Sequence, residues 1–293
     1  MRCAVITLVA GRHSHLQLQR TGLLAGTLRP DRHIVVTMQD GAVRNLLDER
    51  APRVDIVETP RQAGGLPLAR ARNLGAQQAM SAGADLLIFL DVDCVPGPML
   101  VSRYVQHAAQ EMRPSLLCGP VSYLPPPPRS GYRLSSLPEL GRPHPARPVP
   151  PETGALAGGD HALFWSLSFA VRAALWRELG GFCEQYTGYG AEDTDFGQVA
   201  ASRGIALTWV GGAWAYHQYH PSPDPPRRPG TGAGTGRESG VAAARREHPA
   251  CQRRSQANPV THPGAVPAVS HRWLRAWPCP HQMRPSPGEC HDQ

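Results

Sequence analysis

Short apolar segments alternate with helix-like segments along the first 120 residues, and this alternation restricts the fold more than any other feature of the chain. Strands are predicted at residues 3–9, 32–38, 54–57, 85–90 and 116–121. Helices are predicted between them, at residues 15–28, 43–50, 66–82 and 97–111. Continuously apolar strands separated by helices are typical of a mostly parallel sheet that is covered on both faces. We therefore expect an α/β fold of Rossmann-like type, with its binding site beyond the carboxyl ends of the strands.

The second half of the chain contains an interruption. Residues 124–157 are rich in proline and include the run of four at 125–128. This composition predicts a long loop or a stiff extended segment, which at this length is usually a lid or a binding loop. The alternation then resumes, with strands predicted at 164–171 and 205–210 and helices at 172–179 and 191–203.

The composition changes abruptly at residue 221. Residues 221–293 hold 13 Pro, 10 Arg and 5 acidic residues, and they show neither the helix period nor the strand period. Such a segment buries too little apolar surface to offset its conformational entropy. The sequence thus predicts a folded domain over 1–220 and a disordered Pro/Arg/Gly-rich tail over 221–293. An arginine-rich arm that contacts anionic lipid or nucleic acid, and an out-of-frame translation product, are the alternatives.

The net charge of +7 comes from 30 basic residues that are all arginine. This bias is typical of a GC-rich coding sequence, so the charge gives little support to a nucleic-acid partner, and we expect none. The chain has no stretch of 18 uncharged apolar residues, and the apolar run at its N-terminus is too short for a signal peptide. We expect a cytoplasmic location, with peripheral contact at the inner face of the membrane left open.

The strongest local motif is Asp91-Val92-Asp93, directly after the apolar run DLLIFL. Residues i and i+2 of an extended segment point the same way, so the two carboxylates repel each other unless a cation lies between them. Mg²⁺ and Mn²⁺ prefer such oxygen ligands and keep open positions for substrate phosphates. The alternative is an ordinary turn after a strand, where aspartate is common.

A second acidic cluster lies at Glu192-Asp193-Thr194-Asp195, after the glycine-rich turn Gly188-Tyr189-Gly190. Acidic residues favour a helix N-terminus through the helix dipole, which explains the cluster without any chemistry. A carboxylate held at a pocket by this turn could instead act as a general base on a hydroxyl. His217, 24 residues beyond Asp193, could complete a metal site with Asp93, although a lone histidine is more often structural.

Three polar residues precede the Asp91 motif on a predicted helix: Arg70, Arg72 and Asn73. An arginine near a strand end could bind a phosphate, and ordinary surface arginines are the alternative. Asp40 follows the second predicted strand and could accept a hydrogen bond from a base or a sugar.

Taken in order, these motifs resemble the family 2 glycosyltransferases, which have the nucleotide-sugar-binding GT-A fold. The resemblance spans about residues 3–220, and residues 164–220 are similar to the C-terminal segment of the galactosyltransferase-like branch. It implies that Asp91 and Asp93 are the family's metal-binding Asp-x-Asp motif. It implies that His217 completes the metal site, with His220 as the other candidate.

The resemblance also assigns the remaining roles. Asp193 and its neighbour Glu192 are the expected catalytic residues, with Asp193 matching the family's catalytic base. Nucleotide-sugar contacts are expected from Asp40, Arg70, Arg72, Asn73, Asp91 and Trp165, the last by stacking on a sugar ring. Two departures stand out: residues 9–13 replace the family's usual Pro-x-x-Asn turn, and the sequence after His220 lacks the usual further helices.

The implied activity is transfer of a sugar from a nucleotide-diphosphate donor to an acceptor hydroxyl, with inversion and with Mn²⁺ or Mg²⁺ as cofactor. The acceptor is expected to be a sugar, a lipid-linked molecule or a small molecule. Two alternatives stay open. One is a nucleotidyltransferase of similar fold, and the other is a truncated, inactive relative of the glycosyltransferases.

Overall fold

The structure of the protein is a computed structural model. It describes residues 1–47, 52–60, 65–188 and 190–221. The predicted tail at 221–293 lies outside these residues except for Pro221, so its disorder stays a prediction. None of the helices within the described ranges is long and apolar enough to cross a membrane.

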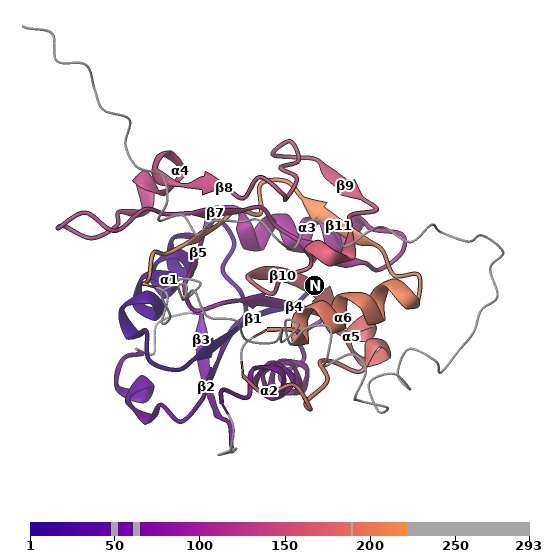
Figure 1. Ribbon diagram of the computed structural model, residues 1–293, viewed down its shortest axis with the longest axis horizontal. Coiled ribbons are helices and arrows are strands. Elements are labelled where there is room, and N and C mark those ends of the chain that lie inside the picture. The colour runs from indigo at the N-terminus through magenta and orange to yellow at the C-terminus, as the bar shows by residue number, and fades with distance from the viewer. Residues whose placement is uncertain (48–51, 61–64, 189, 222–293) are drawn as a thin grey trace, which may run out of the picture. The chain divides into compact units, whose positions relative to one another are not determined.

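An eight-stranded sheet forms the centre of the described part, with the strand order β3-β2-β1-β4-β10-β6-β11-β9 (Figure 1). The first four strands in this order are parallel to one another, whereas β10 is antiparallel to both of its neighbours. Their bounds are β1 Cys3–Val9, β2 Arg32–Thr37, β3 Arg53–Glu58, β4 Leu86–Leu90, β6 Leu116–Cys118, β9 Ala155–Ala157, β10 Ser168–Arg172 and β11 Leu207–Val210. The predicted α/β fold with a sheet covered by helices is confirmed.

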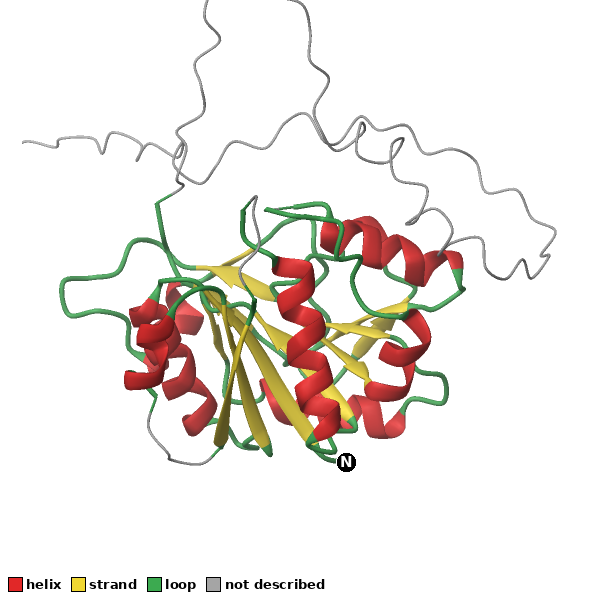
Figure 2. Cartoon of the chain, turned by 90° about the horizontal axis from the view of Figure 1, so that it is seen from below, coloured by secondary structure: helices red, strands yellow, loops and turns green. Residues whose placement is uncertain are grey.

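Helices cover both faces of this sheet (Figure 2). One face packs against α2, α5 and α6, and the other against α1 and α3. The bounds are α1 His13–Ala25, α2 Leu68–Ser81, α3 Leu100–Gln110, α5 Ala173–Leu179 and α6 Glu192–Ser202. Alternate residues of one strand serve the two faces: Ile6 of β1 contacts the first core and Val5 the second. The central strands β1 and β4 are accordingly buried along their whole length.

A second sheet extends the fold beyond the carboxyl end of β4, with the order β5-β12-β7-β8. Its strands are β5 Cys94–Pro96, β7 Val121–Tyr123, β8 Arg142–Pro143 and β12 Ala215–His217. The parallel pair β6–β11 of the first sheet continues as the parallel pair β7–β12 of the second. A Cβ on Gly119 would lie 2.1 Å from the Ala213 carbonyl oxygen, so glycine permits the close approach of the two chain segments where they change sheets.

Several predicted elements differ from the structure. The strand expected at 116–121 divides into β6 and β7 because Gly119-Pro120 breaks the ladder. The helix expected at 43–50 is the 3₁₀ helix η1 Gly41–Asn45, and residues 48–50 lie outside the described ranges. The strand expected at 164–171 begins only at Ser168, as β10, because residues 166–167 form a turn.

The Pro-rich segment 124–157, predicted to be a long loop or an extended segment, contains short helices and strands. It forms η2 Leu134–Ser136, α4 Leu137–Leu140, β8 and β9, and it closes the edges of both sheets. Short strands can carry proline at a sheet edge, where a missing N–H leaves no gap in the ladder. Sequence periodicity could not reveal them, because strands of two or three residues show no period.

Candidate active site

Three parallel strands end side by side and bring polar loops to one edge of the main sheet. β1 leads into Gly11-Arg12-His13, β2 leads to Asp40, and β4 leads into the motif at Asp91 and Asp93. The Gly11 amide and His13 Nε2 each contact Asp40 Oδ2, both at 2.8 Å. Partial burial raises the pKa of Asp40, but the hydrogen bonds from His13 and Gly11 outweigh it, and the net pKa is lowered. Asp40 therefore stays ionised and fixes the loop after β1.

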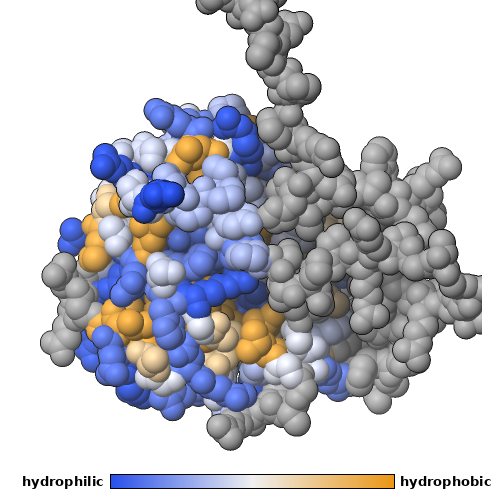
Figure 3. Space-filling view, turned by 60° about the vertical axis from the view of Figure 1, so that its left-hand side comes forward, coloured by the Kyte–Doolittle hydropathy of each residue, from blue (hydrophilic) through white to orange (hydrophobic). Residues whose placement is uncertain are grey.

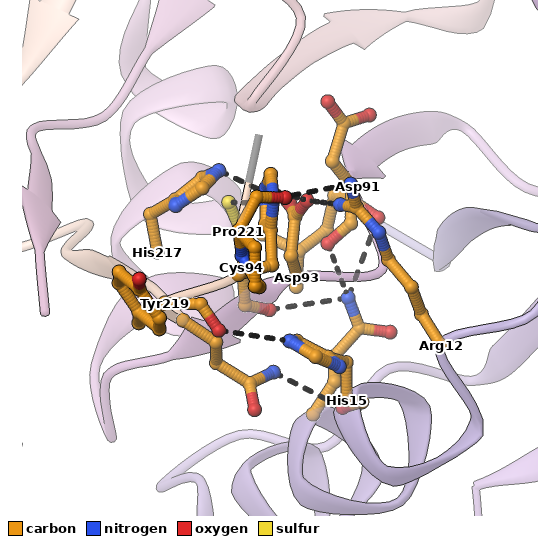
Figure 4. A network of polar contacts seen from close by, with 12 residues as sticks. Arg12, His15, Asp91, Asp93, Cys94, His217, Tyr219 and Pro221 are labelled. Atoms are coloured by element: carbon orange, nitrogen blue, oxygen red, sulfur yellow. Dashed lines mark hydrogen bonds and ion pairs between the residues drawn. The ribbon is translucent and has the colours of Figure 1, made fainter. Parts of the chain in front are cut away.

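The second sheet places His217 beside Asp93. β12 pairs antiparallel with β5 so that His217 lies opposite Cys94, and the Gln218 amide donates to the Asp93 carbonyl at 2.7 Å. His217 Nε2 is 3.6 Å from Asp93 Oδ1, and His220 Nε2 is 3.4 Å from Asp93 Oδ2. One ligand atom from each of these three residues lies within 4.8 Å of the other two. Figure 4 shows His217 and Arg12 on opposite sides of Asp93.

The protonation states of this group suit a divalent cation. Burial raises the pKa of Asp93, but His220, His217 and Arg12 outweigh it and lower that pKa to about 2. Burial lowers the pKa of His217 despite the opposing charge of Asp93, so its imidazole is neutral near pH 7. An ionised carboxylate and a neutral imidazole are the ligand forms that metals require. One carboxylate oxygen and two imidazole nitrogens are therefore a donor set that could hold a divalent cation.

Arg72 of α2 joins the two acidic clusters. Its guanidinium is buried, and it donates to Glu192 Oε1 at 2.9 Å and to Asp91 Oδ1 at 3.4 Å. Desolvation raises the pKa of Asp91 to about 7, and the charges of Asp93 and Asp193 act in the same direction against Arg72. Asp91 and Asp193, two predicted site residues about 100 positions apart in the sequence, thus influence one another electrostatically.

Asp193 lies in the first turn of α6, partly exposed, and its Oδ2 accepts from the Ser166 amide at 3.4 Å. Its neighbour Glu192 is buried against Arg72, with 4% of its surface exposed. Of the two, Asp193 is therefore the more accessible carboxylate. Glu192, predicted to share the catalytic role, holds Arg72 in place.

The remaining predicted residues differ in how they relate to this site. Asn73 uses both ends of its amide on Phe182, at 2.9 Å each, and thereby fixes the Gly-Gly-Phe turn to α2. Arg70 is partly buried in the first turn of α2. Trp165 precedes Ser166, stacks edge-on with His144 at 5.0 Å between ring centroids, and lies under the Arg147 guanidinium at 4.8 Å. These roles toward a nucleotide sugar stay predictions.

Sequence reasoning missed one buried support of the motif loop, Gln19 of α1. Gln19 Nε2 donates to the carbonyls of Asp91 and Cys94, at 2.7 and 3.1 Å, and Gln19 Oε1 accepts from Thr7 at 2.9 Å. The sequence pattern that could have indicated this role is the position of Gln19 on the same helix face as the apolar residues Leu16 and Leu23. Arg12 was noted only as a departure from the family's turn.

No protein-family model matches the sequence. Validoxylamine A glucosyltransferase from Streptomyces hygroscopicus subsp. limoneus is 29% identical over 234 residues, covering 69% of this chain and 49% of that protein. Chondroitin synthase of Pasteurella multocida (strain Pm70) is 24% identical over 212 residues, covering 64% of this chain and 22% of that protein. The chain thus matches about half, or less, of the length of these relatives.

Two solved structures show the same fold. S. aureus TarS, residues 1–349, has a TM-score of 0.53 at 15% identity, covering 74% of this chain and 60% of that chain. GalNAc-T7, solved with UDP, GalNAc and Mn²⁺, has a TM-score of 0.57 at 18% identity, covering 80% of this chain and 46% of that chain. The resemblance to glycosyltransferases of the GT-A fold, predicted from the motifs, is confirmed.

Proposed function

We propose that residues 1–220 form the catalytic domain of an inverting glycosyltransferase, which transfers a sugar from a nucleotide-diphosphate donor to an acceptor hydroxyl with a divalent cation. The observation that supports the proposal is that the Arg72 guanidinium contacts both Asp91, two residues before Asp93, and Glu192, the neighbour of Asp193. We assign Asp93, His217 and His220 to a cation-binding group and Asp193 to the role of the base. The homologous glycosyltransferases support the reaction class.

The two carboxylates would divide the chemistry of an in-line displacement. Asp93, His217 and His220 would hold the cation, which when bound acts as a Lewis acid toward the leaving diphosphate. Asp193 accepts the proton of the acceptor hydroxyl as its oxygen attacks the anomeric carbon from the opposite face. No covalent intermediate forms, so the configuration at that carbon inverts.

The donor would lie along the carboxyl ends of β1, β2 and β4. Asp40 lies where a base or ribose would be read, and the Asp91 motif lies where the diphosphate would end. We propose a UDP-sugar as donor, because GalNAc-T7 was solved with UDP and TarS with UDP-GlcNAc. A sugar or another small hydroxyl compound is proposed as acceptor, with Trp165 as the stacking surface beside Asp193.

Turnover of a donor panel tests this function. The full chain with Mn²⁺ and a UDP-sugar is expected to release UDP when an acceptor is supplied. Asp193→Asn should reduce the release by at least about a hundredfold, the usual size of a general-base contribution, and leave UDP binding nearly unchanged. Unchanged turnover in Asp193→Asn would exclude Asp193 as the catalytic base. Release of pyrophosphate from a nucleoside triphosphate and a sugar phosphate would instead favour a nucleotidyltransferase.

A further inference from the structure

Arg12 occupies the position at Asp93 that a bound cation would require. Its guanidinium forms an ion pair with Asp93 Oδ2 and lies 3.3 Å from His220 Nδ1. Both partners belong to the three-residue group described above as the cation-binding group. Figure 4 shows the Arg12 side chain reaching across from the start of α1 to the carboxylate.

The backbone holds Arg12 in this position. Arg12 has φ 53° and ψ 38°, the left-handed region that a side chain other than glycine, asparagine or aspartate rarely adopts. Its carbonyl accepts from the amides of His15 and Leu16, and its neighbours Gly11 and His13 are bound to Asp40. Strained backbone that is fixed from both sides is a common feature of functional loops.

One carboxylate oxygen cannot serve a guanidinium and a divalent cation at full strength, because the two positive charges repel each other at contact distance. The Arg12 side chain is 36% exposed, so its guanidinium has solvent into which it can turn. A planar guanidinium also matches the geometry of phosphate oxygens, to which it can donate two hydrogen bonds. A diphosphate beside Asp93 would therefore offer Arg12 a second partner.

We propose that Arg12 is an internal cation of this site. It neutralises Asp93 while neither metal nor diphosphate is bound, competes with the divalent cation for that carboxylate, and exchanges Asp93 for the donor diphosphate when the latter binds. The competition with metal depends on this chain's own residues alone. The contact with diphosphate rests on the proposed function. A direct consequence is that metal binds weakly by itself and more strongly when a diphosphate engages Arg12.

The first experiment titrates the full chain with Mn²⁺ alone and follows free Mn²⁺ by electron paramagnetic resonance. Arg12→Ala and Arg12→Gly are expected to bind Mn²⁺ about tenfold more tightly than the wild type, within the usual range of coupling between sites. Using both variants separates the lost charge from relief of backbone strain, and Arg12→Lys should stay near the wild type. Arg44→Ala removes an equal charge from an exposed ion pair with Glu58 and should change nothing.

Asp93→Asn in the Arg12→Ala background should abolish the tighter Mn²⁺ binding. This result would show that the gain in affinity depends on the Asp93 carboxylate. Equal or weaker Mn²⁺ binding by Arg12→Ala and Arg12→Gly would overturn the competition.

The second experiment measures binding of inorganic pyrophosphate in EDTA. The wild type is expected to bind it about tenfold more tightly than Arg12→Ala, and equal affinities would overturn the diphosphate contact. Neither readout depends on sugar transfer. If both effects appear while no UDP-sugar is turned over, the proposed function fails and the role of Arg12 stands.

Discussion

Gln19 illustrates how a single buried amide can position the loop that carries Asp91 and Asp93. The side chain is fully buried, and it joins helix α1 to the backbone on both sides of Asp93. A fixed donor at these carbonyls prevents the motif loop from turning its carboxylates away. The amide also accepts from Thr7, whose hydroxyl contacts His33 at 3.1 Å. The support of the site therefore extends through the sheet as a chain of buried polar groups.

We predict that Gln19→Leu destabilises the protein by about 1–3 kcal/mol, because the carbonyls of Asp91 and Cys94 lose their buried donor. It should also weaken Mn²⁺ binding, because the Asp93 carboxylate loses its fixed orientation. Urea unfolding and a Mn²⁺ titration measure the two effects. Gln17→Leu, on an exposed position of the same helix, is the control and should change stability by less than about 0.5 kcal/mol. Equal behaviour of the two variants would contradict the role of Gln19.

His33 makes stability depend on pH. Burial, with a smaller contribution from the charge of Arg20, lowers its pKa from the ordinary histidine value of 6.5 to about 3 in the folded protein. Between pH 6.5 and about pH 3, His33 is therefore protonated in the unfolded chain but neutral in the folded protein. The contribution of neutral His33 is complete above pH 6.5 and is lost progressively as the pH falls toward 3.

We predict that His33→Gln removes this dependence. Between about pH 6 and pH 4, the unfolding free energy of the wild type should fall by about 1.4 kcal/mol per pH unit more than that of the variant, the value for one proton. Urea titrations at several pH values measure the difference in slope. Parallel slopes for the two proteins would show that His33 takes up its proton without unfolding.

The residue-level roles were only partly readable from the sequence. The motif spacing indicated the acidic pair at Asp91 and Asp93, and the late histidine His217 was expected beside it. The sequence could not show that Glu192 is buried against Arg72 while Asp193 is accessible, because adjacent residues at a helix start differ only in which face they occupy. It also left His217 and His220 as alternatives, whereas both lie next to Asp93.

At the scale of elements, the contact of α2 with the sheet depends on a glycine. Gly75 lies in the interior of α2, where an added Cβ would be 2.4 Å from Ile6 Cγ2 and 2.9 Å from Val36 Cγ2. Glycine lowers intrinsic helix stability, so its presence here reflects the close approach of helix and strands. α2 carries Arg72, and its distance from β1 sets how deeply that guanidinium reaches between the acidic clusters.

We predict that Gly75→Ala destabilises the protein by about 1–3 kcal/mol, because the methyl group overpacks the contact with β1 and β2 and exceeds the gain in helix propensity. Gly41→Ala is the matched control, since its Cβ would meet nothing within 4 Å and its φ is not in the left-handed region. Thermal and urea unfolding compare the two. A stabilised Gly75→Ala would mean that helix propensity dominates and that α2 can move outward freely.

The long central strands and their helices were predictable because each strand contains a run of consecutive apolar residues that serves both faces of the sheet. The second sheet was not, because β5, β7 and β12 have three residues each and follow no period. Their pairing depends on tertiary contacts. It requires the close approach at Gly119, where the chain segments that follow β6 and β11 pass together from the first sheet to the second. The position of His217 beside Asp93 depends on the same event.

At the scale of the whole molecule, the chain corresponds to about half of its curated relatives or less. Apolar and polar residues are interspersed on the face that Figure 3 shows. Within the described ranges, the large apolar side chains that are exposed lie in separate parts of the chain: Met1, Leu28, Leu66, Met99, Met112, Val149 and Leu156. The role of residues 221–293, and the identity of the acceptor, stay predictions from sequence.

A crystal of the full chain grown with Mn²⁺ and UDP tests most directly whether these distant segments share one site. The anomalous difference map should show Mn²⁺ bound to Asp93 and to His217 or His220, with the diphosphate beside it and Asp193 facing the open side of the donor. Mn²⁺ bound elsewhere, or UDP located away from the ends of β1, β2 and β4, would contradict the account.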